Sequence, residues 1–562
     1  MRKFSKKPGI SYRHIGRYGE IISVLFKYGF DDLLSTLKVE RYTRIGSRLI
    51  SRRRKRVARE LSRWQRVTLA MEDLGPTFIK LGQFMSNRPD VVPAGLLVEL
   101  ERFQDKVAPF ESRRSVEIIE KDLGRRMETV FASFEHDPFA SASIAQVHRA
   151  ILRTGEEVAV KIKRPRIDET FNIDIEIMYY IAHLLHRHLE EARGLDLMRV
   201  VGEFERAVRK EIDFQMEATQ MERFANNFKN DPRLHVPYIY RSYSSRRVLT
   251  IEFIKGMKVS NVDELEKAGL DSRRIASEGA DIVLKQIFDH GFYHADPHPG
   301  NIIIRPDGVI CFIDFGMMGV VSPSLREHLG LIMFGIVNDD PKRIVKTLLQ
   351  LSRGPAEDAE LLEYEITELI EEYSFLSLKD YNIGDMLRRL LNIIRSHQLV
   401  MIPGVYLLIK ALITIEGVGR RLDPDFNMIN HVEPFARRMM KERFSPRSLG
   451  FDFYMALMDI SSLVKDLPTD MRDIIRTVKS GKMHIEFEHK GLEPMLTKLD
   501  QLTTRLVFAI VLVALVVGSS LVILSNVPPI VNGIPLIGII GFVGAGLIGF
   551  WLLYVILRHG KM

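Results

Sequence analysis

Three polar side chains stand at a spacing that suits chemistry. The stretch YHADPHPGN, residues 293–301, holds Asp296 and Asn301 five positions apart, and the strand-like run ICFIDFG then delivers Asp314. One carboxylate can meet an incoming hydroxyl or water, while an amide and a second carboxylate can ligate Mg²⁺ on nucleotide phosphates. We therefore expect Asp296 to act as a base or to position water, and Asn301 and Asp314 to bind Mg²⁺ beside ATP.

The order of these residues follows the pattern of protein kinases. The kinase catalytic loop reads H-R-D-L-x-x-x-N and is followed by D-F-G. Here His294, Asp296 and Asn301 take the three positions of the loop, and Asp314–Gly316 supplies the second motif. Either motif alone is weak or moderate, but both in order with VAVK upstream outweigh a coincidence of turns.

An upstream strand predicts a lysine that contacts the phosphates. The β-branched run VAVK ends in Lys161. In a kinase-like site this lysine reaches the α- and β-phosphates and is held by a helical glutamate. The acids available in KEIDFQMEA are Glu211, Asp213 and Glu217. Asp213 and Glu217 are i, i+4 neighbours on one helix face while Glu211 points elsewhere, and each is alternatively an ordinary surface acid.

A predicted phosphate loop precedes that strand. In FASASIAQVH, residues 139–148, the glycine positions of G-x-G-x-x-G-x-V are alanines. The predicted nucleotide-binding residues are Ala140, Ser141, Ala142, Ser143, Ile144, Ala145, Gln146 and Val147. Glycine lets a backbone approach phosphate closely and reach positive φ, whereas alanine adds a Cβ and stiffens the loop. We expect an altered nucleotide geometry and poor activity on peptides rather than loss of binding.

The rest of the kinase pattern is matched in part. Within TIEFIKG, residues 250–256, backbone groups near Glu252 and Ile254 would pair with adenine. Ala295 replaces the arginine that usually answers an activation-loop phosphate, and neither A-P-E nor a long activation segment follows D-F-G. Phospho-switching and a platform for a peptide substrate are therefore not expected. His298 is expected to be a hydrogen-bonding structural residue rather than a catalytic one.

The elements around these residues form a strand-rich piece followed by a helix-rich one. RAILRTGEEVAVKIKRP reads as a hairpin that turns at Thr154–Gly155, and a strand pattern returns at 246–256. Segments with the helical period are expected at 168–192, 197–228 and 272–290, with mostly helical sequence onward to about 480. Farther upstream, Lys80 and Gln83 share a helix face, which is alternatively a surface stripe.

Two apolar runs lie near the C-terminus. Leu506–Leu524 and Pro535–Leu557 carry no charge and are long enough to cross a bilayer, with a turn-rich loop between them. The cationic residues lie outside the pair, at Lys498, Arg505, Arg558 and Lys561. The positive-inside rule then predicts a two-helix membrane hairpin with the body and both termini in the cytoplasm. Two buried core helices are the alternative.

Small residues recur at every fourth position in the second run. Gly541, Ala545 and Gly549 would allow a close approach of another helix or ligand. They could join the two helices, dimerise the protein or admit a flat lipid tail. Glycine is also common in membrane helices, so the spacing does not decide among these.

The composition fits a large folded chain in a reducing compartment. The 562 residues are 46% hydrophobic and 27% charged with a net charge of +8, and Cys311 is the single cysteine. The N-terminus lacks the apolar segment of a secretory signal. Eleven Lys and Arg but one acid lie between Arg41 and Arg66, which suits anionic lipid or a solvated helix face. Without interleaved aromatics or a reader motif, no nucleic-acid partner is expected.

These motifs together resemble the UbiB/AarF family of atypical kinase-like ATPases, of the bacterial membrane-anchored type. The matching pieces are KLGQ at 80–83, FASASIAQVH, VAVK, EID at 211–213, HADPHPGN and DFG. The similarity covers roughly residues 70–320, and the C-terminal hairpin also fits. The resemblance implies an α+β, protein-kinase-like bilobal fold with an added N-terminal helical domain that carries the K-x-G-Q motif.

The resemblance also implies roles. Lys80 and Gln83 would lie on a domain that covers the active site, Glu211 and Asp213 would face it, and Glu217 would hold Lys161. The family implies ATP and Mg²⁺ as cofactors, ATPase activity with possible phosphorylation of a small molecule or lipid, and support of ubiquinone (coenzyme Q) or other isoprenoid-lipid synthesis. A prenylated quinone precursor, anionic lipid, other quinone-biosynthesis proteins and a second copy are the expected partners, at a bacterial inner membrane.

The resulting division of the chain has five parts. They are a basic and helical extension at 1–125, an N-lobe at 126–255, a helical C-lobe at 256–480, a linker at 481–503 and the hairpin at 504–558. Two other functions stay open: a small-molecule phosphotransferase of the aminoglycoside or choline kinase kind, and a nucleotide-gated lipid-binding scaffold without catalysis.

Overall fold

The structure is a computed structural model of the whole chain, and it describes most of the sequence. The described residues are 15–30, 61–88, 91–101, 108–188, 196–352, 358–374, 382–443, 458, 472, 492–525, 528–531 and 534–559. Most of the basic stretch between Arg41 and Arg66 lies outside them. The chain forms two compact units, 1–450 and 451–562, and each is described by itself.

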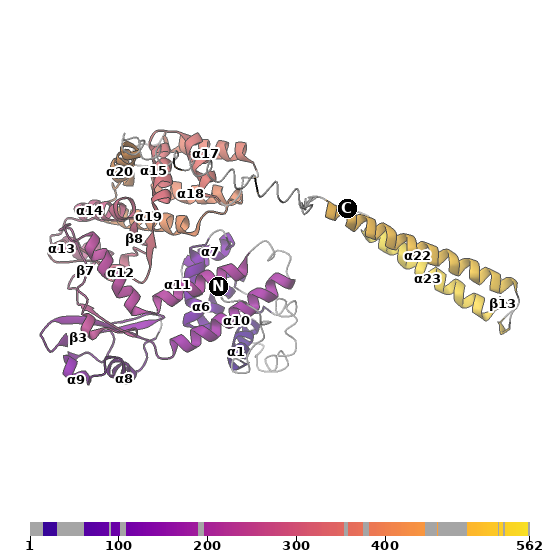
Figure 1. Cartoon of the computed structure of the whole chain (residues 1–562), viewed down its shortest axis with the longest axis horizontal. Helices are drawn as coiled ribbons and strands as arrows, with labels where there is room; N and C mark the ends of the chain where they lie inside the picture. Colours follow the sequence, from indigo (N-terminus) through magenta and orange to yellow (C-terminus); the bar gives the residue numbers. More distant parts are fainter. Residues whose placement is uncertain are drawn as a thin grey trace. The chain divides into compact units, whose positions relative to one another are not determined.

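An antiparallel sheet forms the N-lobe of the first unit (Figure 1). Its strands are β1 (Phe131–Phe134), β2 (Ala140–Ser141), β3 (Ala145–Leu152), β4 (Glu157–Lys163) and β6 (Val248–Glu252). The order is β1-β3-β4-β6, with β2 paired to β3. Gly155 has φ 101°, the left-handed backbone that the predicted β3–β4 turn requires. One face of the sheet buries apolar side chains against α8 (Ser112–Leu123) and α9 (Met127–Val130).

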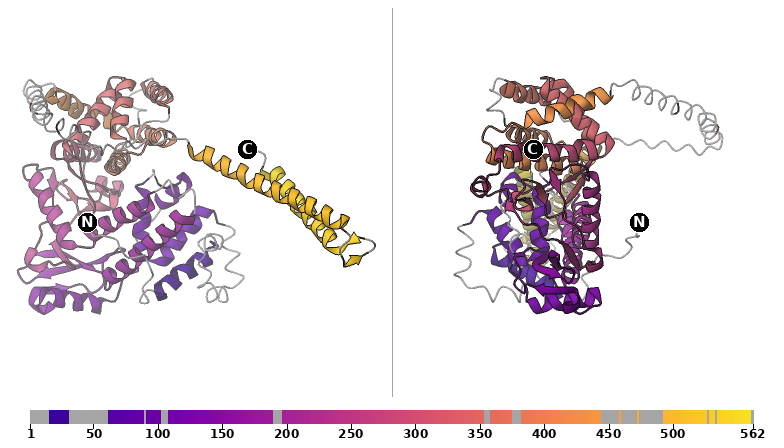
Figure 2. Two further views of the ribbon diagram at one scale, coloured as in Figure 1. Left: turned by 45° about the vertical axis from the view of Figure 1, so that its right-hand side comes forward. Right: turned by 90° about the vertical axis from the view of Figure 1, so that its left-hand side faces the viewer.

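A group of helices lies beside this lobe, which we call the helical extension (Figures 1 and 2). Its helices are α1 (Ile15–Lys27), α5 (Arg63–Leu74), α6 (Pro76–Ser86), α7 (Ala94–Glu101), α10 (Ile167–His188) and α11 (Leu197–Glu211). Buried residues of α1, α5, α6, α10 and α11 share one apolar core. Two ion pairs cross it, Arg17 with the fully buried Asp174 and Arg88 with Glu203.

The single helix predicted over 197–228 is wrong. The structure ends α11 at Glu211 and begins α12 (Phe214–Asn227) after a break at Ile212–Asp213. The Asp213 side chain caps α12 by accepting a hydrogen bond from the Gln215 N–H (3.1 Å). Ile212 is buried in the core of the helical extension. Helical periodicity continues through both residues, so the pattern could not reveal the change of direction.

The C-lobe is mainly helical. Its elements in the first unit are β5 (Leu234–His235), β7 (Met257–Lys258), α13 (Val262–Lys267), α14 (Ser272–Lys285), the π-helical η3 (Gln286–His290), β8 (Phe292–His294), η4 (Pro299–Asn301), β9 (Ile302–Ile304), β10 (Ile310–Phe312), β11 (Met318–Val320), α15 (Pro323–Val337), α16 (Pro341–Leu351), α17 (Ala359–Ser374), α18 (Ile383–Ser396), α19 (Pro403–Leu422) and α20 (Met428–Arg443). The short η2 (Arg241–Tyr243) precedes β6 and packs against the N-lobe sheet. Short sheets β5-β10-β9-β7 and β8–β11 carry the loops of the site.

The second unit contains a pair of long apolar helices. They are α22 (Leu492–Leu524) and α23 (Leu536–His559), with β12 (Ile530–Val531) and β13 (Ile534–Pro535) between them. Because α22 begins at Leu492, the linker predicted over 481–503 already contains helix. Among the described residues, Leu506–Leu524 is the helix that is long and apolar enough to cross a membrane, and Leu536–Phe550 is a shorter apolar stretch.

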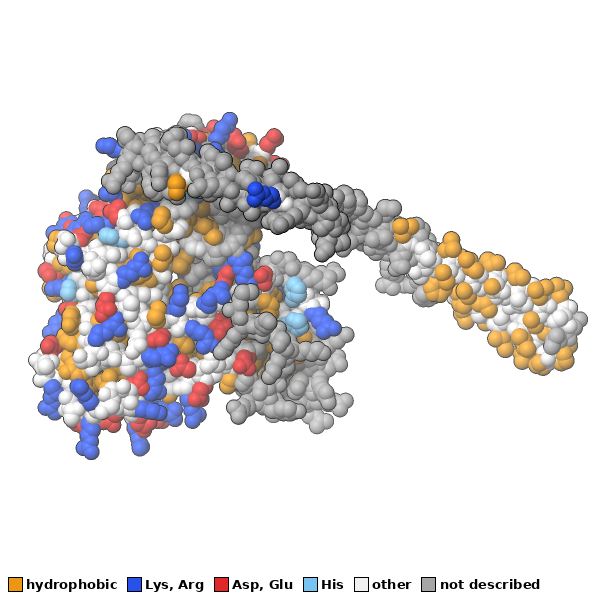
Figure 3. All heavy atoms as spheres, viewed as in Figure 1, with side chains coloured by type: hydrophobic (Ala, Val, Ile, Leu, Met, Phe, Trp, Pro, Cys, Tyr) orange, Lys and Arg blue, Asp and Glu red, His pale blue; other side chains and the backbone are white. Residues whose placement is uncertain are grey.

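The small residues of α23 face α22. A Cβ at Gly541 would lie 2.1 Å from Ser519 Oγ, and one at Gly549 would lie 3.7 Å from Leu512. Ala545, between them, is 3% exposed. The stripe therefore joins the two helices, the first of the three uses open from the sequence. The outward surface of the hairpin is apolar (Figure 3), as expected for contact with lipid rather than water.

Candidate active site

A buried ion pair joins the N-lobe sheet to helix α12. Lys161 lies on β4 opposite Val147 and Leu249, and its Nζ donates to both carboxylate oxygens of Glu217, at 2.8 and 3.0 Å. Glu217 is only 3% exposed. The Lys161 Nζ also lies 3.7 Å from Asp314 Oδ1. Of the three acids considered from the sequence, Glu217 is thus the partner that the structure gives to Lys161.

Charge and burial together set the ionisation of Lys161 and Asp314. Burial alone would lower the pKa of Lys161, but the charges of Asp314 and Glu217 outweigh it and raise this pKa. Burial would raise the pKa of Asp314, yet Lys161, the Gly316 N–H and Lys80 together hold it down at about 2. Lys161 is therefore cationic and Asp314 anionic at neutral pH, the charge states that a phosphate contact and a metal ligand need.

His294 connects the two catalytic segments. Its Nε2 donates to the backbone carbonyl of Asp314, and its Nδ1 accepts from the N–H of Asp296 (3.3 Å). The Gln286 side chain, at the start of the π-helical turn, accepts from the His294 N–H (2.9 Å). Burial lowers the pKa of His294, which favours the neutral ring that this pair of bonds requires.

The D-F-G turn packs inward and is followed by a short segment. Phe315 is fully buried against Phe224 of α12, with ring centroids 5.2 Å apart. Asp314 Oδ1 accepts from the Gly316 N–H (2.9 Å). The chain then forms β11, which pairs with β8, and enters α15 at Pro323. The connection from the turn to the next helix is accordingly too short for a long activation segment.

The oxygen atoms near this turn fit a hard divalent cation. Asp296 is half-buried, and its backbone carbonyl accepts from Asn301 Nδ2 (3.3 Å). Because the amide nitrogen of Asn301 is engaged in this way, its side-chain oxygen stays available as a ligand. The Asp314 side chain is anionic and 46% exposed. Carboxylate and amide oxygens are ligands that Mg²⁺ accepts, so these residues are compatible with it. His298 Nδ1 accepts from the Gly300 N–H (3.0 Å), a structural bond.

The helical extension reaches the site through Lys80. Its ammonium on α6 is paired with Glu211, at the end of α11. A Cβ at Gly316 would lie 3.5 Å from Glu211 Cγ, so this pair lies against the D-F-G turn. Asp213 is instead paired with Arg246 (3.0 Å). Among the described contacts, the Gln83 backbone carbonyl accepts hydrogen bonds from the side chains of Ser86 and Asn87. These contacts do not involve the Gln83 side chain, whose predicted role at the site stays a prediction.

Half of the residues of the predicted phosphate loop, Ser143 to Gln146, are buried in the protein. Gln146 is fully buried, donates to Ser115 Oγ (2.9 Å) and accepts from the Phe110 N–H (3.0 Å). Ser143 and Ile144 are also buried. The Gln146 side chain is thus engaged within the protein, and the predicted nucleotide contact of this residue, which its backbone could make, stays a prediction. In β3, Gln146 faces away from Val147, and strict alternation along the strand could have revealed this.

The alanine positions of this loop need no special backbone. Among the described residues with positive φ, none lies between Ala140 and Val147. The Ala142 N–H donates to the Ala145 carbonyl (2.8 Å), which closes a tight turn between β2 and β3. Alanine therefore fits each position without the strain that a left-handed residue would cause. Contacts of this loop with nucleotide remain predictions.

The predicted hinge has part of its backbone occupied. The N–H of Glu252 donates to the Tyr238 carbonyl (2.8 Å), and that of Phe253 donates to the Glu157 carbonyl (3.1 Å). The Glu252 carboxylate is bound to His235 (2.8 Å). A backbone N–H that donates to adenine must therefore come from Ile254 or a later residue. Of the two predicted residues, Glu252 and Ile254, only Ile254 could supply this donor.

Arg164 was not predicted from the sequence as a residue of the site. This side chain leaves the end of β4, three positions after Lys161, and bonds to the phosphate loop. Its partners are 22 and 23 residues away in the chain. The run KIKRP shows only that a cation follows the strand, so spacing alone could not have identified the contact.

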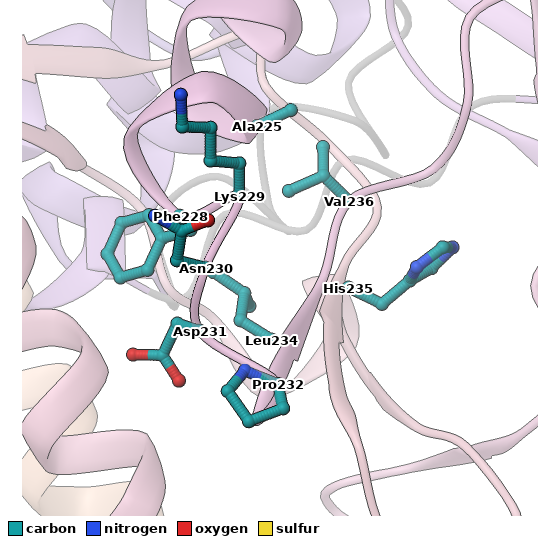
Figure 4. Close-up of a pocket in the computed structure, with 9 residues that line it drawn as sticks. All are labelled: Ala225, Phe228, Lys229, Asn230, Asp231, Pro232, Leu234, His235 and Val236. Atoms are coloured by element: carbon teal, nitrogen blue, oxygen red, sulfur yellow. The ribbon is translucent and has the colours of Figure 1, made fainter.

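A hollow of about 590 Å³ lies beside the C-terminal end of α12 (Figure 4). It is lined by Ala225, Phe228, Lys229, Asn230, Asp231, Pro232, Leu234, His235 and Val236, none of them a residue of the site above. Its charged side chains point in different directions. Hydrogen bonds from Arg233 and Lys285 lower the pKa of Asp231, so that carboxylate is already paired. The hollow therefore lacks a convergent set of polar groups.

Comparisons with known proteins agree with this geometry. The family model of the ABC1 atypical kinase-like domain matches residues 102–348, the UbiB helical domain matches 366–427, and the ABC1/UbiB kinase-like C-terminal domain matches 490–558. A probable protein kinase UbiB from Marinobacter nauticus is 36% identical over 75% of this chain and 78% of its own length. The chain belongs to the ABC1/UbiB kinase-like family. The resemblance drawn from the motifs is thereby confirmed.

Other relatives cover more of the chain. An uncharacterized protein encoded in the hydrogenase 1 5′ region of Clostridium pasteurianum is 31% identical over 88% of this chain and 93% of its own length. The solved structure of Rv3197 with erythromycin from Mycobacterium tuberculosis is 23% identical and covers 66% of this chain and 94% of that chain. Its TM-score is 0.46, so the two structures are only distantly alike.

Family membership confirms the coarse architecture. The chain has a kinase-like fold of mixed helices and sheets, and the model named for the UbiB helical domain falls on α17 to α19 of the C-lobe. The part of the helical extension from α1 to α7, which carries Lys80, lies upstream of all three matched regions, whereas α10 and α11 fall within the first of them. One apolar helix near the C-terminus, together with UbiB relatives, indicates an association with membranes.

Proposed function

We propose that this member of the ABC1/UbiB family is a membrane-anchored, Mg²⁺-dependent ATPase or atypical kinase. It would support the synthesis of ubiquinone or a related isoprenoid lipid. The observation that carries the proposal is the joined set of Lys161, Glu217 and Asp314, with Asp296 and Asn301 linked to it through His294. The intact set of Lys161, Asp296, Asn301 and Asp314 argues against a scaffold without catalysis.

The side chains divide the reaction among them. The Lys161 ammonium, held by Glu217, would contact the α- and β-phosphates of ATP. Asp296 would accept the proton of the attacking water or hydroxyl as the new O–P bond forms and the bond to ADP breaks. Asp314 and Asn301 would hold Mg²⁺, which when bound neutralises charge on the phosphates. Lys80 and Glu211, beside Gly316, would border the place of the acceptor.

The hairpin supports a lipid-soluble acceptor or ligand. Both apolar helices expose Leu, Ile, Val and Phe side chains outward, and the cations in the sequence flank the hairpin rather than its turn. We infer two membrane crossings, with the body and both termini in the cytoplasm of a bacterium. A prenylated quinone precursor would then meet the enzyme within the bilayer. Anionic lipid, other proteins of the same synthesis and a second copy are further partners proposed here.

Lipid and metabolite profiling of a deletion strain tests the proposed function. The strain would carry the wild type, Asp296→Asn or the control Asp307→Asn, which alters an exposed acid in the turn between β9 and β10. We expect wild type and Asp307→Asn to restore the isoprenoid quinone, and Asp296→Asn to leave a precursor accumulated. Full restoration by Asp296→Asn at equal protein level would contradict a catalytic role.

Assays of the purified protein separate the alternatives. Binding of ATP with no turnover, even with lipid present, would favour a nucleotide-gated scaffold. Stoichiometric phosphorylation of a soluble acceptor would favour a phosphotransferase of the aminoglycoside or choline kinase kind. Turnover that depends on the hairpin and on lipid would support the membrane-anchored enzyme.

A further inference from the structure

Arg164 binds the phosphate loop and the segment that precedes α8. Its Nε donates to the Ala142 carbonyl (2.9 Å), and its Nη2 donates to Ser141 Oγ (3.0 Å) and to the Ala108 carbonyl (2.8 Å). The guanidinium also lies over the Phe110 ring, 5.7 Å from its centroid. The rigid planar fork of a guanidinium suits these three acceptors and the ring together, a geometry that the compact ammonium of lysine does not reproduce.

The backbone of the same residue holds the tip of the loop. The Arg164 N–H donates to the Ile144 carbonyl (2.8 Å). The Ile144 side chain is 6% exposed and packs in the core of the helical extension, which also contains Phe78 and Ile175. The loop is therefore fixed on one side by Arg164 and on the other by the helical extension.

The position of Arg164 links this clamp to the phosphate contact. Lys161 lies on β4, and Arg164 follows directly after that strand, so one strand end carries both the predicted phosphate contact and the clamp. A glycine loop can adjust to its nucleotide, but a loop of alanines held at Ser141, Ala142 and Ile144 has little freedom. The distance between loop backbone and Lys161 is then set before a nucleotide arrives.

We propose that Arg164 is a positioning residue for the phosphate loop, one that fixes the loop relative to Lys161 and thereby sets the affinity for nucleotide. This rests on the proposed function, because it assumes that residues 140–147 meet phosphates. The clamp itself can be tested without nucleotide.

The variant Arg164→Lys keeps the charge but loses the fork. Arg247→Lys is the matched control, since Arg247 is a half-buried arginine of the same lobe whose fork binds Asp122 of α8 rather than the loop. Hydrogen–deuterium exchange of the full-length protein in nanodiscs would follow residues 140–147. We expect faster exchange of this loop, the Ala142 N–H included, in Arg164→Lys and no change there in Arg247→Lys.

Equilibrium binding of ATP and ADP with Mg²⁺ is the second readout. Loss of bridging bonds from a charged group should weaken binding by about tenfold in Arg164→Lys and leave Arg247→Lys near wild type. Ser141→Ala, which removes one acceptor, should have a smaller effect that is not additive with Arg164→Lys.

Each outcome decides one claim. Unchanged loop exchange and unchanged Kd in Arg164→Lys would overturn the positioning role while leaving the proposed function intact. Equal losses in Arg164→Lys and Arg247→Lys would also overturn it, because a general loss of stability would then explain both. Absence of nucleotide binding by the wild type would overturn the proposed function together with the affinity claim, and loop exchange would still decide whether Arg164 clamps the loop.

Discussion

Two loops of the candidate site use their side chains differently. In the predicted catalytic loop, residues 294–301, the carboxylate of Asp296 and the amide oxygen of Asn301 remain available for chemistry. In the predicted phosphate loop, residues 140–147, several side chains are instead engaged within the protein. The Asn301 side-chain nitrogen donates a hydrogen bond to the Asp296 backbone carbonyl, which leaves the side-chain oxygens of both residues available. Gln146 is instead buried in a hydrogen-bond network with Ser115, and Ile144 is buried in the core of the helical extension. Phosphate contacts made by backbone tolerate new side chains, but proton transfer and metal binding need particular ones.

Removal of Lys161, the lysine predicted to contact the phosphates, should have the largest effect on ATP turnover. Lys161→Met leaves Glu217 buried without its cation and removes the predicted contact to ATP, so we expect ATP turnover to fall by at least about 100-fold. Steady-state assays in nanodiscs would measure it. Lys163→Met, at a neighbouring lysine paired with Asp168, is the control. Turnover within a few fold of wild type in Lys161→Met would place the phosphates elsewhere.

Gln146→Leu should affect stability more than nucleotide use. Loss of its amide leaves the Phe110 N–H and Ser115 without their partner, which should cost about 1–3 kcal/mol of unfolding free energy. Denaturant melts would measure this, with Gln215→Leu on the exposed side of α12 as a control expected to change little. A large rise in the Kd for ATP with unchanged stability would instead mean that the Gln146 side chain contacts the nucleotide.

Glycine at an alanine position of the phosphate loop should produce a change of a few fold. Ala142→Gly removes a Cβ and loosens the tight turn that the Ala142 N–H closes. We expect altered relative affinities for ATP and ADP, measured by equilibrium binding, with Ala140→Gly acting in the same direction. Identical affinities of wild type and variants for both nucleotides would mean that these alanines serve packing alone.

The smallest expected effect is on the pH dependence of turnover. The lowered pKa of Asp314, about 2, keeps this group ionised above that pH, so it should not limit kcat/KM between pH 5 and 8. Its favourable interactions are present above the unfolded pKa of about 3.9 and are lost as the pH falls through the folded value. Lys80→Met removes one nearby cation, so we expect the pKa of Asp314 to move upward by less than about one unit, and the pH profile of turnover should show no new ionisation between pH 5 and 8. A downward shift would contradict the sign of this interaction.

The sequence predicts the candidate residues of the site more readily than the contacts that hold them in place. Asp296, Asn301 and Asp314 follow from spacing, because a loop, a strand and a turn are local structures. The break at Ile212–Asp213 did not follow, since burial of Ile212 in the helical extension depends on residues far along the chain. The partners of Gln146 and Arg164 are likewise non-local. A residue's type and spacing can predict what it could do, but its contacts decide which way it points.

Mg²⁺-dependent ATP turnover by the purified full-length protein tests the central claim most directly, with wild type compared with Asp314→Asn in lipid nanodiscs. The substitution keeps the size of the side chain and removes the charge that Lys161 and Lys80 hold in place. We predict turnover by the wild type, its loss on chelation of Mg²⁺, and a fall of at least about 100-fold in Asp314→Asn. Undiminished Mg²⁺-dependent turnover by a correctly folded Asp314→Asn protein would contradict the account.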